Sequence, residues 1–477
     1  MSEKKTRVER DSIGEMNIPI DAYYGVQSLR AHENFMITGY TMRPEMINSL
    51  AQVKKACAIA NLKAGQLPEN VAIAIEQACD EILEGKLHKE FIVDPVQGSA
   101  GTSMNMNANE VIANRAIEIL GGQKGDYSIV HPNDHVNYGQ STNDVIPTAG
   151  KITIIKFANN LIKELNALYD ALMRKADEFN DVIKMGRTQL QDAVPILLGQ
   201  EFKAYATAVK RTTVNIGHVL DDLHYINMGG TAIGTGINAD TYFYQIVARE
   251  LSKVTGMELY QAEDTIDGTQ HIDCFPAVSG AVRTCAVALS KMCNDLRLLS
   301  SGPRCGFGEI NLPAKQNGSS IMPGKVNPVI PEVVNQAAFL CIGNDVTVSM
   351  AAEAGQMELN AFEPITFYCL FSSMEVLTNS IHTLIVNCIN GITANKEHCY
   401  DMVHNSVGII TTLVPHIGYQ HAADIAKKAI KTGQPVRDLI LQEKLLTEKE
   451  LDIILDPWNM TKPGISGEEL LEGRSKE

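Results

Sequence analysis

The sequence lacks the cysteine and histidine spacings of structural metal sites and redox-active dithiols. It has ten cysteines but no CxxC pair, and none of its twelve histidines forms a cluster with cysteine. The pair His131 and His135 has Pro132 between its members, which argues against a regular helical pair. We therefore expect no structural metal, and reduced thiols that mostly serve as small core residues of a cytosolic protein.

Long apolar runs and basic runs are also missing. No apolar stretch reaches the roughly 18 residues of a membrane-spanning helix. The N-terminus, MSEKKTRVERDSIG, is charged and has no apolar core of a secretion signal. The formal net charge is −15, from 56 acidic and 41 basic side chains, and basic residues occur only singly or in pairs. A cytoplasmic protein that binds neither nucleic acid nor membranes is the expectation.

Glycine and proline, the residues that interrupt helices, are rare or absent in five long stretches. In the longest, apolar residues recur in steps of four and three, which predicts a helix-packing seam. The five stretches are Lys151–Met185, Gln200–Met228, Ala281–Ser301, Glu332–Ala354 and Ile365–Asn390. They predict five long helices between about residues 147 and 391.

The helices indicate a mainly α fold, because the chain shows no βαβ rhythm and no short repeat. Helices of this length seldom bury their apolar surface within one chain, so a bundle that continues across subunits is expected. We expect a mostly helical N-terminal domain over 1–146, a central five-helix oligomerisation domain over 147–395, and a small C-terminal domain over 396–477.

Four segments rich in hydroxyls, amides and glycine interrupt the helical pattern. Each is predicted to begin or end a helix, where free backbone N–H groups favour anions. They are QGSAGTSMNMNANEVIANRA (97–116), HPNDHVNYGQSTNDVIPT (131–148), GRTQLQDAVP (186–195) and GSSIMPGKVNP (318–328). One such segment alone is typical of helix capping or a turn. Four of them, the last with a lysine, favour a shared binding location.

The last of these segments lies in the densest cluster of helix breakers. Leu312–Pro331 holds four prolines and two glycines, which excludes a helix interior or a central strand. A long loop is therefore predicted here. The segment GGTAIGTG (229–236) has the glycine spacing of some nucleotide-binding loops, but it follows a predicted helix rather than a strand, and we interpret it as a turn.

Taken together, the four segments resemble the fumarase/aspartase superfamily of lyases. GSSIMPGKVNP is close to the signature loop of that superfamily, and the resemblance extends from DAYYGVQSLRAHENF (21–35) to MTKPGISG (460–467). Within the superfamily, four segments resemble the corresponding segments of aspartases: AGTSMNMNANEVIAN, NDHVN, QSTND and KVNPVIPEVVNQ. Fumarases of this type tend to have GTQ before NMN, NDDVN in place of NDHVN, and KVNPTQ in the loop. Argininosuccinate and adenylosuccinate lyases have different residues between the proline of the loop and its terminal Asn-Pro.

The resemblance implies a fold and a reaction. The fold is a three-domain, mainly α chain whose homotetramer packs the central helices into one twenty-helix core, with each active site drawn from three subunits. The reaction is the reversible conversion of L-aspartate to fumarate and ammonia through an enediolate, without an organic cofactor. These small molecules would be the partners of the chain besides its own copies.

The resemblance also assigns roles to individual residues. Ser319 would be the general base, with its alkoxide stabilised by backbone N–H groups of the loop and by nearby positive charge, and Gly318 and Gly324 would let the loop close. The other residues would bind substrate: Thr102, Ser141, Thr142 and Ser320 at the enediolate, Lys325, Asn327 and Thr188 at the α-carboxylate, and Asn143 with Gln189 at the ammonium.

Gln189 bears on the choice of leaving group. Fumarase and many relatives read GRTH where this chain reads GRTQ. Histidine can transfer a proton near pH 7 and glutamine cannot. An ammonium already carries its proton, whereas expulsion of hydroxide needs an acid, so glutamine favours an amine leaving group. Class II fumarase remains an alternative, as does a helical structural protein that has lost activity, like the lens crystallins related to this superfamily.

Overall fold

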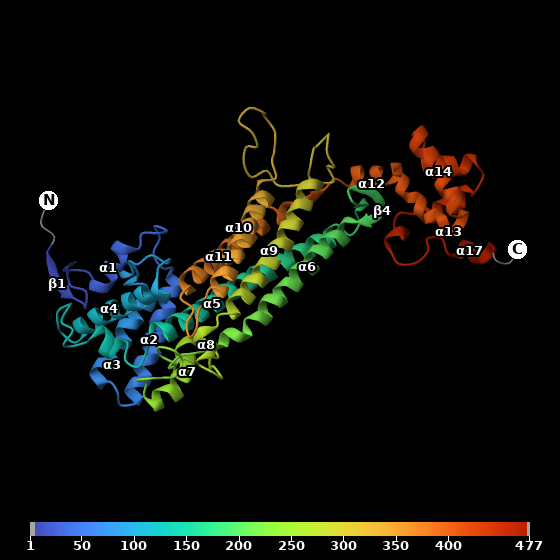
Figure 1. The fold of residues 1–477 in the computed structure, drawn as a ribbon. Coiled ribbons are helices and arrows are strands. Elements are labelled where there is room, and N and C mark those ends of the chain that lie inside the picture. Colours follow the sequence, from blue (N-terminus) through green and yellow to red (C-terminus); the bar gives the residue numbers. More distant parts are fainter. Residues whose placement is uncertain (1–4, 475–477) are drawn as a thin grey trace. The chain divides into compact units, whose positions relative to one another are not determined.

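The computed structural model describes residues 5–474, with side chains to residue 471 (Figure 1). The chain is mainly α, which confirms the predicted fold class. The chain divides into two compact units, and each unit consists of three segments that are separate in the sequence. The first comprises Met1–Lys163, Val214–Ala286 and Phe339–Thr378, and the second comprises Glu164–Thr213, Val287–Ala338 and Asn379–Glu477. The three domains proposed from the sequence remain a prediction.

The first unit begins with a β-hairpin that the sequence analysis did not predict. In it β1 (Thr6–Arg10) pairs antiparallel with β2 (Glu15–Pro19). Helices follow: α1 (Val26–Asn34), α2 (Pro44–Lys63), α3 (Glu69–Leu83), α4 (Thr102–Ile119), α7 (Thr241–Thr255) and α8 (Asp267–Gln270). The short strands β5 (Tyr225–Ile226) and β6 (Tyr260–Gln261) pair in parallel. Helix α2 packs against α3 and α7 through fully buried residues such as Leu50 and Ala56.

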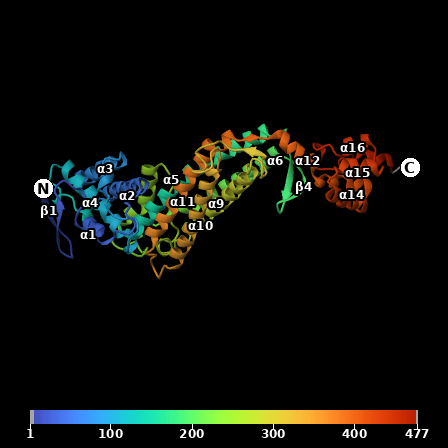
Figure 2. The same cartoon turned by 90° about the horizontal axis from the view of Figure 1, so that it is seen from above.

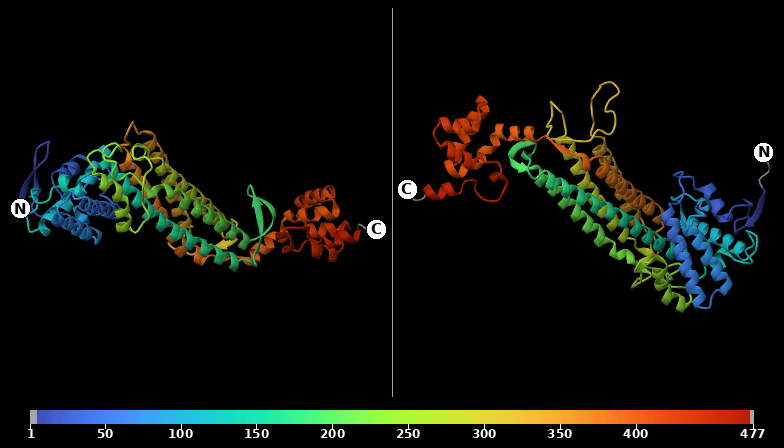
Figure 3. Two further views of the ribbon diagram at one scale, coloured as in Figure 1. Left: turned by 90° about the horizontal axis from the view of Figure 1, so that it is seen from below. Right: turned by 180° about the vertical axis from the view of Figure 1, so that it is seen from behind.

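The five predicted long helices are present, and each contributes residues to both units. They are α5 (Thr142–Glu178), α6 (Leu198–Val219), α9 (Cys274–Leu299), α10 (Val329–Glu353) and α11 (Glu363–Asn387). Figures 1 and 3 show them side by side. In the first unit Phe371 stacks on Phe157, and in the second Asn335 Nδ2 donates to Ser290 Oγ at 2.8 Å.

Two predicted C-terminal helix ends are wrong, and two helices start earlier than predicted, among them α9, which starts at Cys274 rather than Ala281. The first helix stops at Glu178, not Met185, because β-branched Val182 and Ile183 lead into a strand. The second stops at Val219 and is followed by a 3-10 turn and by β5, so Met228 is not helical. The first helix also starts earlier than predicted and includes Pro147.

Proline at position 147 leaves one carbonyl of α5 without its helical partner. The Pro147 nitrogen has no hydrogen to donate to the carbonyl of Asn143, four residues earlier. Asn227 Nδ2 donates to this oxygen at 3.0 Å instead. The side chain of one loop residue thus completes the first turns of the longest helix, and GGTAIGTG (229–236) follows directly as an irregular loop.

The second unit contains a hairpin and a cluster of short helices around their own core (Figure 2). Strands β3 (Ile183–Thr188) and β4 (Gln191–Leu197) form the hairpin, and β7 (Ile310–Asn311) pairs with β8 (Thr393–Ala394). The short helices are α12 (Lys396–Asn405), α13 (Val414–Ile417), α14 (Tyr419–Thr432), α15 (Val436–Gln442), α16 (Glu448–Ile454) and α17 (Glu469–Arg474). Ile183 and Met185 of β3 belong to this core, so the hairpin is anchored at its base.

The cysteines agree with the expectation of reduced thiols in the core, whereas one helix is more apolar than expected. All ten cysteines lie within residues 5–474, none is in a disulfide, and eight are buried. One helix, Glu363–Gly391, is long and apolar enough to cross a membrane by length and composition alone. Of its most apolar window 56% is buried in the structure, and a buried core helix meets the same test.

Candidate active site

Ser141 caps the start of α5. Its Oγ accepts a hydrogen bond from the backbone N–H of Asn143 at 3.2 Å, and its own N–H donates to Asp144 Oδ1 at 2.9 Å. The capping role foreseen for this segment is therefore real. It does not exclude a catalytic role, because a hydroxyl that accepts through a lone pair still has a hydrogen to donate.

The carboxylate of Asp144 links the start of α5 to the loop at 229–231. Its side chain is fully buried, and Oδ2 accepts from the backbone N–H groups of Gly229 and Thr231 at 3.1 and 3.0 Å. Burial raises the pKa of the carboxyl to about 6, against the opposing effect of these hydrogen bonds. The loop that the sequence analysis interpreted as a turn thus supports the helix start that carries three predicted site residues.

Asn143 is held by the same loop. Its Nδ2 donates to the carbonyl oxygen of Ala232 at 2.6 Å. The amide group is thereby oriented, and Oδ1 is the atom that could accept a hydrogen bond from an ammonium group. The predicted contact with the substrate amine is compatible with this orientation.

A buried lysine lies behind Thr142. Lys54 Nζ donates to Asn137 Oδ1 at 2.8 Å and to Gln140 Oε1 at 2.9 Å. Asn105 Nδ2 donates to the same Asn137 oxygen at 3.2 Å and to Thr142 Oγ1 at 3.4 Å. Full burial lowers the pKa of the Lys54 amine to about 8. Sequence reasoning gave no role to Lys54, which stands in an apolar helical pattern, or to Asp144, although Asp144 lies in the QSTND segment quoted above.

Thr102 is the first residue of α4 and follows a strained turn. Ser99, Ala100 and Gly101 have φ values of +61°, +54° and +92°, and the left-handed region is costly for residues other than glycine. Thr102 Oγ1 donates to the Ser99 carbonyl at 2.8 Å. To donate to an enediolate, this hydroxyl would have to exchange that partner. Thr102 also lines a hollow of about 150 Å³ together with Gln27 and Arg30.

Thr188 and Gln189 lie at the tip of the β3–β4 hairpin, not at a helix end, which corrects the expectation for segment 186–195. Thr188 pairs with Gln191, so the connecting turn consists of Gln189 and Leu190. Both have left-handed φ, +54° and +61°, where hairpin turns usually carry asparagine or glycine. The side chains of all four residues, 188 to 191, are exposed.

Ser319 lies in the predicted loop, which Figure 1 shows beyond the start of α10. Its Oγ accepts hydrogen bonds from the backbone N–H groups of Ile321 at 3.2 Å and Met322 at 3.0 Å. These are N–H groups of the kind expected to stabilise an alkoxide at this oxygen. Ser320 and Lys325 are exposed.

The base of this loop is closed by its own residues. Asn327 Nδ2 donates to the carbonyl oxygen of Gly318 at 2.5 Å. A Cβ atom on Gly318 would lie 2.0 Å from the carbonyl oxygen of Lys325, so only glycine fits. Gly318 is thus a point of close backbone approach, whereas Gly324 takes φ +79° and provides the turn.

The ten predicted residues divide between the units. Thr102, Ser141, Thr142 and Asn143 lie in the first unit, and Thr188, Gln189, Ser319, Ser320, Lys325 and Asn327 lie in the second. Within the first unit, Asn105 of α4 links the α4 start to Thr142. Within the second, the residues lie on one hairpin tip and one loop. Neither unit contains the whole set.

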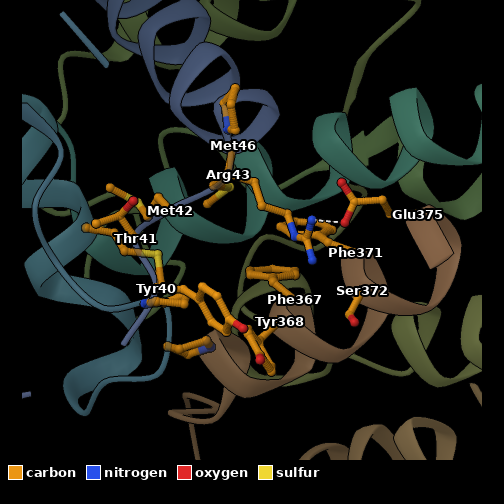
Figure 4. A pocket seen from close by; sticks show the side chains of 14 residues that line it. Tyr40, Thr41, Met42, Arg43, Met46, Phe367, Tyr368, Phe371, Ser372 and Glu375 are labelled. Carbon is orange, nitrogen blue, oxygen red and sulfur yellow. Dashed lines mark hydrogen bonds and ion pairs between the residues drawn. The ribbon is translucent and has the colours of Figure 1, made fainter. Parts of the chain in front are cut away.

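A pocket of about 520 Å³ in the first unit contains none of the ten residues (Figure 4). Aromatic side chains of α11, among them Phe367 and Tyr368, face the segment before α2 across it, and Arg43 pairs with Glu375 at one side. Within the described residues, no three or more His, Cys, Asp or Glu side chains are grouped so that they could hold a metal ion.

Two family models match the chain. A model described as a lyase family matches residues 14–343, and the fumarase C C-terminus model matches residues 409–462. Together they cover α5, α6, α9, the first part of α10, both hairpin strands and helices α13 to α16, whereas α11 lies between the two matches.

Curated relatives and solved structures agree with these matches. An aspartate ammonia-lyase of Bacillus subtilis is 54% identical over 98% of this chain and 99% of its own length. One of Helicobacter pylori is 54% identical over 96% and 98%. The crystal structure of a Brucella melitensis fumarate lyase:delta crystallin bound to cobalt aligns with a TM-score of 0.94 at 50% identity, over 96% of this chain and all of that one. A class II fumarase of Schistosoma mansoni aligns over the same shares with a TM-score of 0.93 at 36% identity.

Proposed function

The chain belongs to the lyase family whose model it matches over residues 14–343, and on that premise we propose that it is an aspartate ammonia-lyase. It converts L-aspartate reversibly to fumarate and ammonia. One observation carries this assignment: identity of 54% over nearly the full length to proteins with that activity in their names, against 36% to a class II fumarase. Gln189 in place of the histidine of fumarases agrees with it.

The difficult step is removal of a proton from the carbon beside the β-carboxylate. Its loss puts a second negative charge on that carboxylate, so preset hydrogen-bond donors must stabilise the enediolate. One such donor contributes about 2.7–4 kcal/mol, and three or four could supply on the order of 10 kcal/mol. We assign this role to the hydroxyls of Thr102, Ser141, Thr142 and Ser320. The capping bonds and the Lys54 network support it, because they hold two of these hydroxyls at a helix start.

Ser319 takes the proton. A free serine is a very weak acid, so its alkoxide must be stabilised. Two backbone N–H groups at 3.0 and 3.2 Å from Oγ support this assignment, because hydrogen bonds to a charged form favour that form. Closure of the loop brings Ser319 to the substrate and excludes water.

The remaining residues bind the two ends of the substrate. Lys325, with Asn327 and Thr188, holds the α-carboxylate; a lysine about 4 Å away supplies about 4 kcal/mol at a surface-like dielectric. Asn143 accepts from the ammonium through Oδ1, with Gln189 beside it. The amine leaves as neutral ammonia.

The active enzyme is a cytoplasmic homotetramer in which three subunits build each site. The support is an apolar face of α10 that stays exposed among the described residues: Phe339, Leu340, Val346 and Met350 are between 46% and 67% exposed. Contiguous exposed apolar side chains of this kind mark interfaces.

The test is a substrate comparison. Purified protein is incubated with L-aspartate and, separately, with L-malate, and fumarate is followed by its ultraviolet absorbance. Fumarate from aspartate and none from malate is expected. Fumarate from malate alone contradicts the assignment in favour of a fumarase, and no product from either indicates a protein that has lost activity.

A further inference from the structure

Glu309 is a fully buried carboxylate outside the predicted site. Its Oε1 accepts from Arg187 Nη1 at 2.7 Å, and its Oε2 lies 3.2 Å from Lys184 Nζ. A carboxylate without solvent needs such partners, because removal of one leaves an uncompensated buried charge. Glu309 therefore joins two cations of β3 to the chain just before the 312–331 loop.

The β3–β4 hairpin is irregular between the two cations that contact this carboxylate. Residues 184 and 187 are three positions apart, so in a regular strand their side chains would point to opposite faces. Met185 pairs with Pro195 and Arg187 with Asp192, so two β4 residues, Ala193 and Val194, lie opposite Gly186, and the extra residue of the bulge is on β4. A Cβ on Gly186 would lie 2.6 Å from the Val194 carbonyl oxygen, so the bulge requires glycine. Bulges of this kind re-aim a side chain.

The Glu309–Arg187 contact is linked through the backbone to the turn at 189–190, which is proposed to lie at the substrate. Arg187 also lies over the ring of Phe307 at 4.2 Å, so its guanidinium is fixed from two sides. Thr188 is the next residue, and the turn after it has two left-handed residues that are not glycine. A turn with this strain depends on a firm base for its geometry.

The backbone of Glu309 holds the entry to the catalytic loop. Its N–H donates to the Leu299 carbonyl at 2.9 Å, and its carbonyl accepts from the N–H of Asn395 at 2.9 Å. The next two residues pair with β8, and the loop begins directly after them at Leu312. One residue is thus common to both segments of the second unit that carry predicted site residues.

We propose that Glu309 is a positioning residue that fixes both the turn after Arg187 and the start of the loop that carries Ser319. This rests on the proposed function, because it assumes that Thr188 binds the substrate carboxylate. Glu309 touches no substrate. It fixes the position and direction of the β3–β4 hairpin tip relative to the start of the loop at Leu312, and both segments belong to the second unit.

Glu309→Gln tests this, because the amide keeps the shape and removes the charge. Arg187 loses its anionic partner, whereas the backbone bonds at the loop entry remain. We expect KM for L-aspartate to rise about tenfold or more and kcat to fall by a smaller factor. The matched control is Glu201→Gln, which removes another partner of Lys184 (3.0 Å) but does not touch Arg187. Both variants lower Tm, but only Glu309→Gln changes KM by more than about twofold.

If Glu309→Gln does not fold, Arg187→Lys tests the same contact from the side of the arginine. Arg187→Lys retains the charge but loses the planar fork that bonds Glu309 and covers Phe307. The same rise in KM, and a smaller Tm shift on addition of fumarate, are expected. Unchanged KM in a folded Glu309→Gln or Arg187→Lys variant overturns the positioning role while the parent enzyme still deaminates aspartate. A parent protein without that activity instead overturns the proposed function.

Discussion

The start of α5 and the loop at 318–328 carry similar side chains, yet the fold holds them differently. At the α5 start, a buried Asp144 accepts three backbone hydrogen bonds, and Lys54 holds the residues that precede Ser141. In the loop, only the Asn327–Gly318 bond closes the base, and the side chains of Ser320 and Lys325 are exposed. Three of the proposed enediolate donors, Thr102, Ser141 and Thr142, thus sit at helix starts, whereas Ser320 and the proposed base Ser319 sit on the loop.

The largest expected effect comes from the loop. Ser319→Ala removes the proposed base, and general-base catalysis contributes about 10²–10⁴-fold, so kcat should fall by that factor. Ser319 contacts only its own loop, so Tm and assembly should stay as in the parent. Steady-state kinetics and size-exclusion chromatography check both, and near-normal turnover contradicts the base assignment.

Lys325→Ala should act on binding. The proposed contact with the α-carboxylate is worth up to about 4 kcal/mol, so KM for L-aspartate should rise by on the order of 10²-fold while kcat changes less. Because the lysine is exposed, stability should be unaffected. An unchanged KM would remove the carboxylate role from Lys325.

At the α5 start, substitution should cost stability as well as activity. Asp144→Asn exchanges one acceptor oxygen for a donor and leaves a buried N–H of the Ser141 or Gly229–Thr231 backbone without a partner. The free energy of unfolding should fall by about 1–3 kcal/mol. Urea unfolding measures it; Asp267→Asn, at an exposed carboxylate, is the control. Equal stability of both variants would mean that the helix start is not held as described.

The last prediction concerns pH and Lys54. Burial lowers the pKa of this amine in the folded chain to about 8, from 10.5. Between these values the unfolded chain binds the proton more than the folded chain does, so the free energy of unfolding should rise as pH increases from 8 to 10.5. Lys54→Met should lack this rise. Thermal unfolding at several pH values checks it, and parallel profiles for parent and variant would contradict it.

The sequence predicted the helices better than the connections between them. Two long helices, α10 and α11, were placed within a few residues of both ends, because glycine, proline and apolar spacing mark them clearly. The β3–β4 hairpin was missed, since Val182, Ile183 and Met185 are apolar in either structure and lie in a stretch without glycine. Strand pairing with β4 decided the outcome, and that interaction is not local.

For the site, motifs predicted the segments but not what supports them. The polar clusters and the resemblance named the hydroxyls, whereas Lys54, Asp144 and Glu309 received no role, because their partners lie 83, 85 and 122 positions away in the sequence. Only the fold brings such partners together. The roles of the ten site residues remain predictions, and the structure adds the contacts by which each can be tested.

Subunit complementation tests the central claim most directly, namely that segments of different copies build one site. Ser319→Ala and Ser141→Ala, each nearly inactive, are unfolded together in equal amounts and refolded. Random mixed tetramers should contain some sites with both serines intact, so activity should return to about a quarter of the parent value. If the mixture stays as inactive as the two variants alone, each site is built by one chain and the account is wrong.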